Sequence, residues 1–271
     1  MKNLLKTEWL KIKYYRAFWW IIGLTAVAYP GINYLFYNIY TSIGHNKDQV
    51  SKMAKFLIGN PFSFPEAWHT VSYFSSYFVF LPAIVVIMFI SNEYTFKTHR
   101  QNIIDGWSRN QFMLAKFIDV TIVSLIVSII LAIIAFIIGM INSNDSSGNM
   151  FDMSYYIGLF FLQTFSQLSL AFLLGFLVRK AFLSLGIFLI YFLILEPILV
   201  GVAKVRFDDI GRFLPLSISN RLIPFPAFLG KLSPEGYGLA IDRILFYVIL
   251  TIILTIITWF LCFRVNSKRD L

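Results

Sequence analysis

The chain has 271 residues, of which 58% are hydrophobic and only 14% charged, with a mean hydropathy of +0.72. Soluble domains carry roughly 25% charged residues, so this composition excludes an ordinary soluble protein and indicates that the bilayer is the solvent. The net charge of +9 would suggest nucleic acid in a soluble protein. In a membrane protein it reflects basic cytoplasmic loops instead, and we predict no nucleic-acid partner.

Six stretches with little or no charge are long enough to cross a membrane. About 20 apolar residues span the hydrocarbon core as an α-helix, and open strands are excluded because lipid cannot satisfy their backbone. We predict an all-α integral membrane protein with one transmembrane domain over residues 1–271. The predicted spans are 18–40, 67–92, 117–142, 153–178, 181–203 and 243–263.

The N-terminal sixteen residues are too charged for a cleaved signal peptide, so we predict an uncleaved first helix. This stretch is either an interfacial helix or a plain basic anchor. With the N-terminus inside, the cytoplasmic segments hold 14 basic residues against nine outside. This bias predicts that both termini are cytoplasmic. We expect a multi-pass protein of a bacterial cytoplasmic (inner) membrane.

The long outer segment, residues 204–242, mixes charges, apolar pieces and four prolines. Short helices that dip into the outer interface are one interpretation. An irregular loop that caps the bundle is the other, and the sequence favours neither.

The connection between the second and third spans, residues 93–116, has room for structure of its own. We predict helical turns over Tyr94–Ile104 and a stop at Gly106, because glycine adopts the left-handed conformation at low cost. Ser108 followed by Gln111 is a capping-box pattern that begins the next helix. The segment is therefore expected to form a short surface helix and a tight turn, the alternative being an ordinary solvated loop.

This connection resembles type-2 ABC transporter permeases, whose pattern is E-[YF]-x-x-x-T-x-R, then G-x-S-R, then K. The matching residues are Glu93, Tyr94, Thr98, Arg100, Gly106, Ser108, Arg109 and Lys116. Lys97 and His99 depart from it, because small residues or glycine are often found there. The predicted topology also resembles that family, which has six helices, an N-terminal interfacial helix, a coupling helix and a structured outer segment.

The resemblance implies the transmembrane subunit of an ABC exporter. Such a subunit pairs with a second copy or a close relative and with two copies of a separate ATPase, and works by alternating access. It implies ATPase-coupling roles for Glu93, Thr98, Arg100, Gly106, Ser108 and Arg109. The chain has no G-x-x-x-x-G-K-[ST] phosphate loop. We therefore expect no cofactor and no catalysis in this chain, with ATP and Mg bound by the partner ATPase and membrane lipid as a further partner.

Two other classes stay open: an integral membrane enzyme acting on lipid, and a channel or structural membrane protein. An enzyme would show clustered carboxylates or histidines at helix ends, and the spans are nearly free of them. A channel would show polar stripes on several spans. The fourth span has one candidate stripe, which can also be its packing face: Gln163, Ser166, Gln167 and Ser169.

Glu196 and Pro197 lie inside the fifth predicted span. A carboxylate at that depth costs roughly 3 kcal/mol on insertion scales, so it usually faces protein or water. Pro197 lacks a backbone donor and is expected to kink the helix. The pair is either part of a substrate path or a protonated or hydrogen-bonded glutamate near the outer end of a kinked helix. No residue identifies the substrate.

Overall fold

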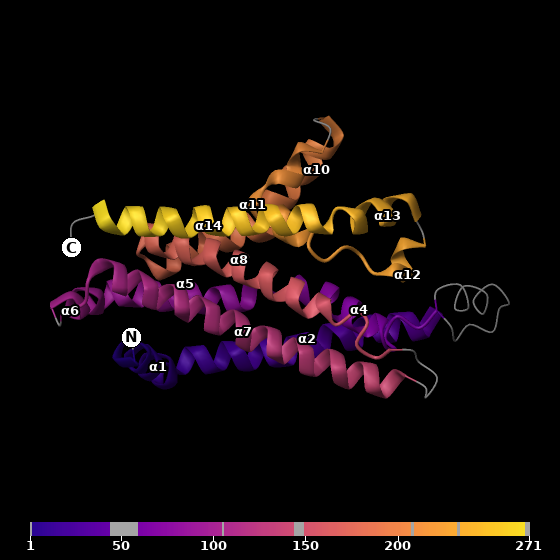
Figure 1. Cartoon of the computed structure of the whole chain (residues 1–271), viewed down its shortest axis with the longest axis horizontal. Coiled ribbons are helices and arrows are strands. Elements are labelled where there is room, and N and C mark those ends of the chain that lie inside the picture. The colour runs from indigo at the N-terminus through magenta and orange to yellow at the C-terminus, as the bar shows by residue number, and fades with distance from the viewer. Residues whose placement is uncertain are drawn as a thin grey trace.

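The computed structural model describes residues 2–43, 59–104, 106–143, 149–206, 209–231 and 234–268. Side chains of residues 2–7 and 43 lie outside this description. The described residues form helices and no strand, as predicted (Figure 1). The first half contains α1 (Lys2–Tyr14), α2 (Arg16–Ile43), α4 (Glu66–Ser76), α5 (Phe80–Thr95), α6 (Thr98–Ile104) and α7 (Arg109–Asn142). The second half contains α8 (Tyr155–Val178), α9 (Ala181–Ile190), η1 (Tyr191–Leu195), α10 (Glu196–Arg206), η2 (Ile210–Phe213), α11 (Pro215–Asn220), α12 (Ala227–Gly230), α13 (Pro234–Asp242) and α14 (Ile244–Lys268).

The long helices run roughly side by side and give the bundle two distinct ends (Figure 1). The α6 end also holds α1 and the last turns of α14, and both marked termini lie there. The α13 end holds α12, α13 and the far ends of α2 and α7. Helix α8 is central, since it packs against α4, α5, α7, α9 and α14. The segment from α9 to α10 diverges from the bundle and is the least buried of the long apolar helices.

Within the described residues, four helices are long and apolar enough to cross a membrane, and a bent pair adds a fifth when it is counted as one span. The four are Arg109–Asn142, Tyr155–Val178, Ala181–Arg206 and Ile244–Lys268. The fifth is α4 with α5, which meet at an angle of 51° within the predicted second span, 67–92. Pro82 lies in the first turn of α5, where a missing backbone donor costs little, so a new helix begins there readily.

Helix α2 covers the predicted first span but does not belong to the apolar set. It contains Trp, Tyr, Asn and an internal proline, Pro30, which lower its hydropathy although the helix has 28 residues. The predicted third span, 117–142, lies within α7, which begins at Arg109 directly after the predicted cap at Ser108. The helix over the predicted fifth span, Ala181–Arg206, continues three residues beyond the predicted end at 203.

The predicted surface helix over Tyr94–Ile104 is divided in two. Helix α5 continues to Thr95, and α6 begins only at Thr98. Lys97 lies between them with φ 56, in the left-handed region that a residue with a Cβ enters at a cost of roughly 1–2 kcal/mol. It is one of the two positions where this chain departs from the small residues of the family pattern. The break therefore follows from the local backbone at Lys97.

The turn that follows α6 matches the sequence prediction closely. Gly106 has φ 97, its N–H donates to the Ile103 carbonyl at 3.0 Å, and Trp107 N–H donates to the Asn102 carbonyl at 3.1 Å. These are the two bonds of a Schellman motif, which needs the left-handed residue that glycine supplies. Ser108 and Gln111 then form the predicted capping box at the start of α7.

The outer segment contains short helices, and α11 lies beside α8. Gln167 Nε2 donates to Ser219 Oγ at 3.0 Å and to Asn220 Oδ1 at 2.8 Å, and Gln163 Nε2 donates to Asn220 at 2.9 Å. The two glutamines follow Tyr155 by eight and twelve residues, which at 1.5 Å per residue is about 12–18 Å along α8. This favours inserted short helices over a capping loop, and it makes the polar stripe of α8 a packing face.

Candidate functional site: the ion cluster behind α6

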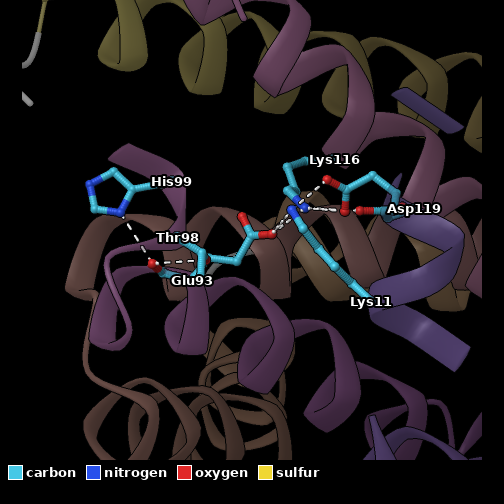
Figure 2. A network of polar contacts seen from close by, with 7 residues as sticks. Lys11, Glu93, Thr98, His99, Lys116 and Asp119 are labelled. Carbon is cyan, nitrogen blue, oxygen red and sulfur yellow. Dashed lines mark hydrogen bonds and ion pairs between the residues drawn. The ribbon is translucent and has the colours of Figure 1, made fainter. Parts of the chain in front are cut away.

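Five charged side chains from three helices meet where α5 leads into α6 and α7 leads away from it (Figure 2). We call them the ion cluster: Glu8, Lys11, Glu93, Lys116 and Asp119. Lys116 Nζ is at the centre, 2.6 Å from Glu8 Oε2, 2.7 Å from Glu93 Oε1 and 3.1 Å from Asp119 Oδ2. Lys11 Nζ completes the cluster, 2.8 Å from Glu8 Oε1 and 2.9 Å from Glu93 Oε1.

Helical spacing explains how three helices bring five charged side chains together. Glu8 and Lys11 on α1, and Lys116 and Asp119 on α7, are each three residues apart and therefore share a helix face. Glu93 is in the last turns of α5 and reaches both lysines. The cluster consequently joins α1, α5 and α7 to one another at the α6 end of the bundle.

The cluster is deeply buried, with Lys116 only 1% exposed. Its ammonium also lies 4.6 Å from the centre of the Phe89 ring and 5.6 Å from that of Phe112. A buried charge is tolerated when it is paired and its hydrogen bonds are satisfied, whereas removal of one partner leaves the others uncompensated. The three helices therefore depend on one another for a stable arrangement here.

Glu8 shows the electrostatic effect most directly. Burial alone would raise the pKa of this carboxyl group, but Lys116 and Lys11 outweigh burial and lower the pKa to about 2. Glu8 is therefore ionised at neutral pH and holds both lysines in place.

Glu93 has a second role through its backbone. Its carbonyl oxygen lies 3.1 Å from His99 Nδ1 and, at a longer 3.4 Å, accepts from Thr98 Oγ1 (Figure 2). Burial lowers the pKa of His99, so the imidazole is neutral at neutral pH. The Glu93 side chain thus pairs with the two lysines of the ion cluster, and the Glu93 carbonyl contacts the first turn of α6.

The remaining residues of the family pattern lie on α6 and at the turn and cap that begin α7. Arg100 is exposed on α6, whereas Gly106 and Ser108 shape the turn and the cap that follow. Arg109 Nη1 donates to the Ser267 carbonyl at 2.8 Å, and Asn266 Nδ2 donates to the Arg109 carbonyl at 2.9 Å. Arg109 therefore ties the start of α7 to the end of α14.

The turn between α8 and α9 also contacts this region. The Arg179 guanidinium lies 4.7 Å from the centre of the Tyr94 ring, and Tyr94 packs on His99 with ring centroids 4.5 Å apart. Arg179 has φ 60 at the end of α8, so the chain reverses there within a residue or two. The turn between α8 and α9 therefore contacts the end of α5, directly before α6.

Sequence reasoning found Glu93 and Lys116 through the family pattern but missed Glu8, Lys11 and Asp119. Two signals pointed to them. Glu8 is the one acidic residue among the first sixteen, and Asp119 follows Lys116 by one helical turn at the start of an apolar span. Their meeting depends on how α1 packs against α7, which no local pattern encodes.

Glu196 lies elsewhere, near the outer segment. It is 2% exposed, and its carboxylate accepts hydrogen bonds from the backbone N–H groups of Leu216, at 3.2 Å, and Ser217. It therefore caps the N-terminus of α11, where negative charge is favoured. The contact fits the hydrogen-bonded alternative; a place on the substrate path stays a prediction.

Pro197 follows a π-helical turn, η1, in which Glu196 N–H donates to the Tyr191 carbonyl. Such turns disturb the regular helical hydrogen bonding. The π-helical turn lies just before Pro197, and the kink expected at Pro197 itself stays a prediction. Among the described residues, no group of His, Cys, Asp or Glu is arranged to hold a metal ion.

Comparison with known proteins agrees with the architecture. A family model described as ABC-2 family transporter protein matches residues 4–195, which include the ion cluster, α6 and Glu93 to Lys116. A search of curated proteins found no match. The match covers most of the chain and includes several apolar helices, so this is a multi-pass membrane protein and a membrane subunit of a transporter, not a catalytic enzyme. The chain belongs to the ABC-2 transporter family.

Proposed function

We propose that the chain is the transmembrane subunit of an ABC exporter driven by a separate ATPase. Two copies of the ATPase bind ATP and Mg, and a second permease chain, identical or closely related, completes the pathway. ATP hydrolysis then moves the substrate across the cytoplasmic membrane by alternating access. The observation that carries the proposal is the family match together with the ion cluster that anchors the helices on both sides of α6.

Helix α6 is the coupling helix in this proposal, and residues 93–116 are the coupling segment. Coupling needs a continuous physical connection between the ATPase and the spans. Glu93 supplies one on the α5 side, because it contacts both α6 and Lys116. The Ser108 capping box supplies another on the α7 side. A displacement of α6 would therefore move α5, α7 and, through Glu8, also α1.

The proposal makes the α6 end cytoplasmic, with six spans when α2 and the bent pair of α4 and α5 each count as one. Single-cysteine labelling tests it, after the one native cysteine, the buried Cys262, is replaced by serine. A cysteine at the exposed Gln101 should react with an impermeant maleimide only in opened cells, and one at Asn149 or Lys231 in intact cells. Labelling of Gln101→Cys in intact cells would overturn the orientation.

The function itself is tested by expressing and purifying the chain together with candidate phosphate-loop ATPases. The purified chain alone should hydrolyse no ATP, because it lacks a phosphate loop. The complex in liposomes should hydrolyse ATP, and candidate substrates should stimulate the rate. A Walker-lysine variant of the ATPase is the control and should be inactive in the same complex. ATP turnover by the rigorously purified single chain would contradict the proposal.

A further inference from the structure

A cavity of about 420 Å³ lies between the outer segment and the rest of the bundle. It is separate from the ion cluster. Its walls come from the end of α4, from α10, α11, α13, the start of α14 and the chain between α11 and α12. Ligand sites for small molecules typically enclose roughly 300–1,000 Å³. The cavity is therefore large enough for a small organic molecule.

The charged side chains that line this cavity, within the described chain, are both arginines. Arg221 is partly neutralised, because its Nη2 lies 3.2 Å from both carboxylate oxygens of Asp209. Its guanidinium also lies 5.7 Å from the centre of the Tyr247 ring. Arg243 is exposed and forms no ion pair with a described residue. The cavity consequently carries an excess positive charge at Arg243.

The rest of the lining combines apolar surface with a few polar groups. Val200, Phe225 and Leu239 contribute apolar surface, and Ser217 and Asn220 contribute polar side chains. Apolar surface with a few convergent polar groups is typical of small-molecule sites.

The wall from α4 ends where that helix breaks before α5. Tyr73 lies in the last turn of α4 and Tyr77 directly follows the helix, and the Tyr77 hydroxyl donates to the Tyr73 hydroxyl at 2.8 Å. Interrupted helices line ligand sites in many membrane transporters, because irregular backbone is tolerated where it faces a cavity. The bend of 51° thus coincides with a position where a ligand would be accommodated.

We propose that this cavity binds an amphipathic organic anion, a carboxylate or phosphate group on an apolar body. Arg243 is the primary anion-binding residue, since a guanidinium holds either group with two hydrogen bonds. The apolar walls take the body of the ligand, and the hydroxyls of Tyr73 and Tyr77 close one side. Neither ATP nor the ATPase is needed for this binding.

Direct binding to the full chain in phosphatidylcholine nanodiscs tests the proposal. The probe is dansylundecanoic acid, read as saturable dansyl emission above that of empty nanodiscs. We expect saturable binding that both laurate and dodecyl phosphate displace and that inorganic phosphate displaces poorly. A dansyl-alkylamine of the same chain length should bind weakly, because its cation faces two arginines.

Two variants locate the site. Arg243→Gln should weaken binding of the probe about tenfold, the loss expected when one charge-assisted contact disappears. Ala240→Trp should abolish saturable binding by filling the cavity. Arg206→Gln is the matched control, because Arg206 is exposed at the end of α10 and does not line the cavity.

Four results would overturn the proposal: equal binding of the cationic analogue, displacement by inorganic phosphate as strong as by dodecyl phosphate, an unchanged affinity in Arg243→Gln, or no saturable binding at all. Because the assay contains no ATPase, such a failure leaves the transport proposal untouched. If the complex fails to transport while the probe still binds, the transport proposal is contradicted and the binding proposal stands.

Discussion

Lys116→Met should destabilise the protein by about 3–5 kcal/mol, the cost of removing one partner from a buried ion pair. Lys116 is the centre of the ion cluster and is 1% exposed, so its loss leaves Glu93 and Asp119 buried with less compensation. The measurement is thermal unfolding in detergent. Trypsin cleavage at Lys13, on α1, should also become faster, because Glu8 loses its contact with α7.

Two variants show whether charge is the cause. Lys11→Met is the matched comparison and should cost less, since the Lys11 side chain is 24% exposed, against 1% for Lys116, and Lys116 still contacts both carboxylates. Lys116→Met combined with Glu93→Gln and Asp119→Asn leaves Glu8 paired with Lys11 and should recover most of the lost stability. If Lys116→Met proves no less stable than Lys11→Met, the cluster does not hold the three helices together.

Arg100→Glu should reduce capture of the partner ATPase at least about tenfold and abolish coupled transport. Arg100 is exposed on α6. Charge reversal places a carboxylate against a partner surface that, in this proposal, is complementary to a guanidinium. Surface substitutions away from buried features usually change stability by only about 0.5 kcal/mol, so insertion and folding should persist. Co-purification with the ATPase and transport by the reconstituted complex are the measurements.

Two comparisons make this result specific to α6. Lys268→Glu makes the same charge change at the same end of the bundle but on α14, and it should leave ATPase capture near the wild-type level. Arg109→Glu should act differently, by loosening α7 from α14 through the lost contact with Ser267. Full ATPase capture and full transport by Arg100→Glu would place the contact surface elsewhere.

The sequence by itself determined the helical class and the local turn chemistry of this protein. Long apolar runs can satisfy their backbone in lipid only as helices, so the all-α class followed from composition. The stop at Gly106 and the cap at Ser108 were predictable because a left-handed glycine and a capping box act within a few residues. The family pattern also pointed to Glu93 and Lys116, because both match it by residue type and spacing alone.

The tertiary structure decided what depends on helix packing. The bend between α4 and α5, the break at Lys97 and the position of α11 beside Gln167 each reflect contacts or backbone conformations that hydropathy does not report. Glu196 would be a costly intramembrane charge without α11, which supplies its two donors. The ion cluster is the clearest case: Glu8 and Lys116 are 108 positions apart, and only the packing of α1 against α7 brings their charges within 2.6 Å.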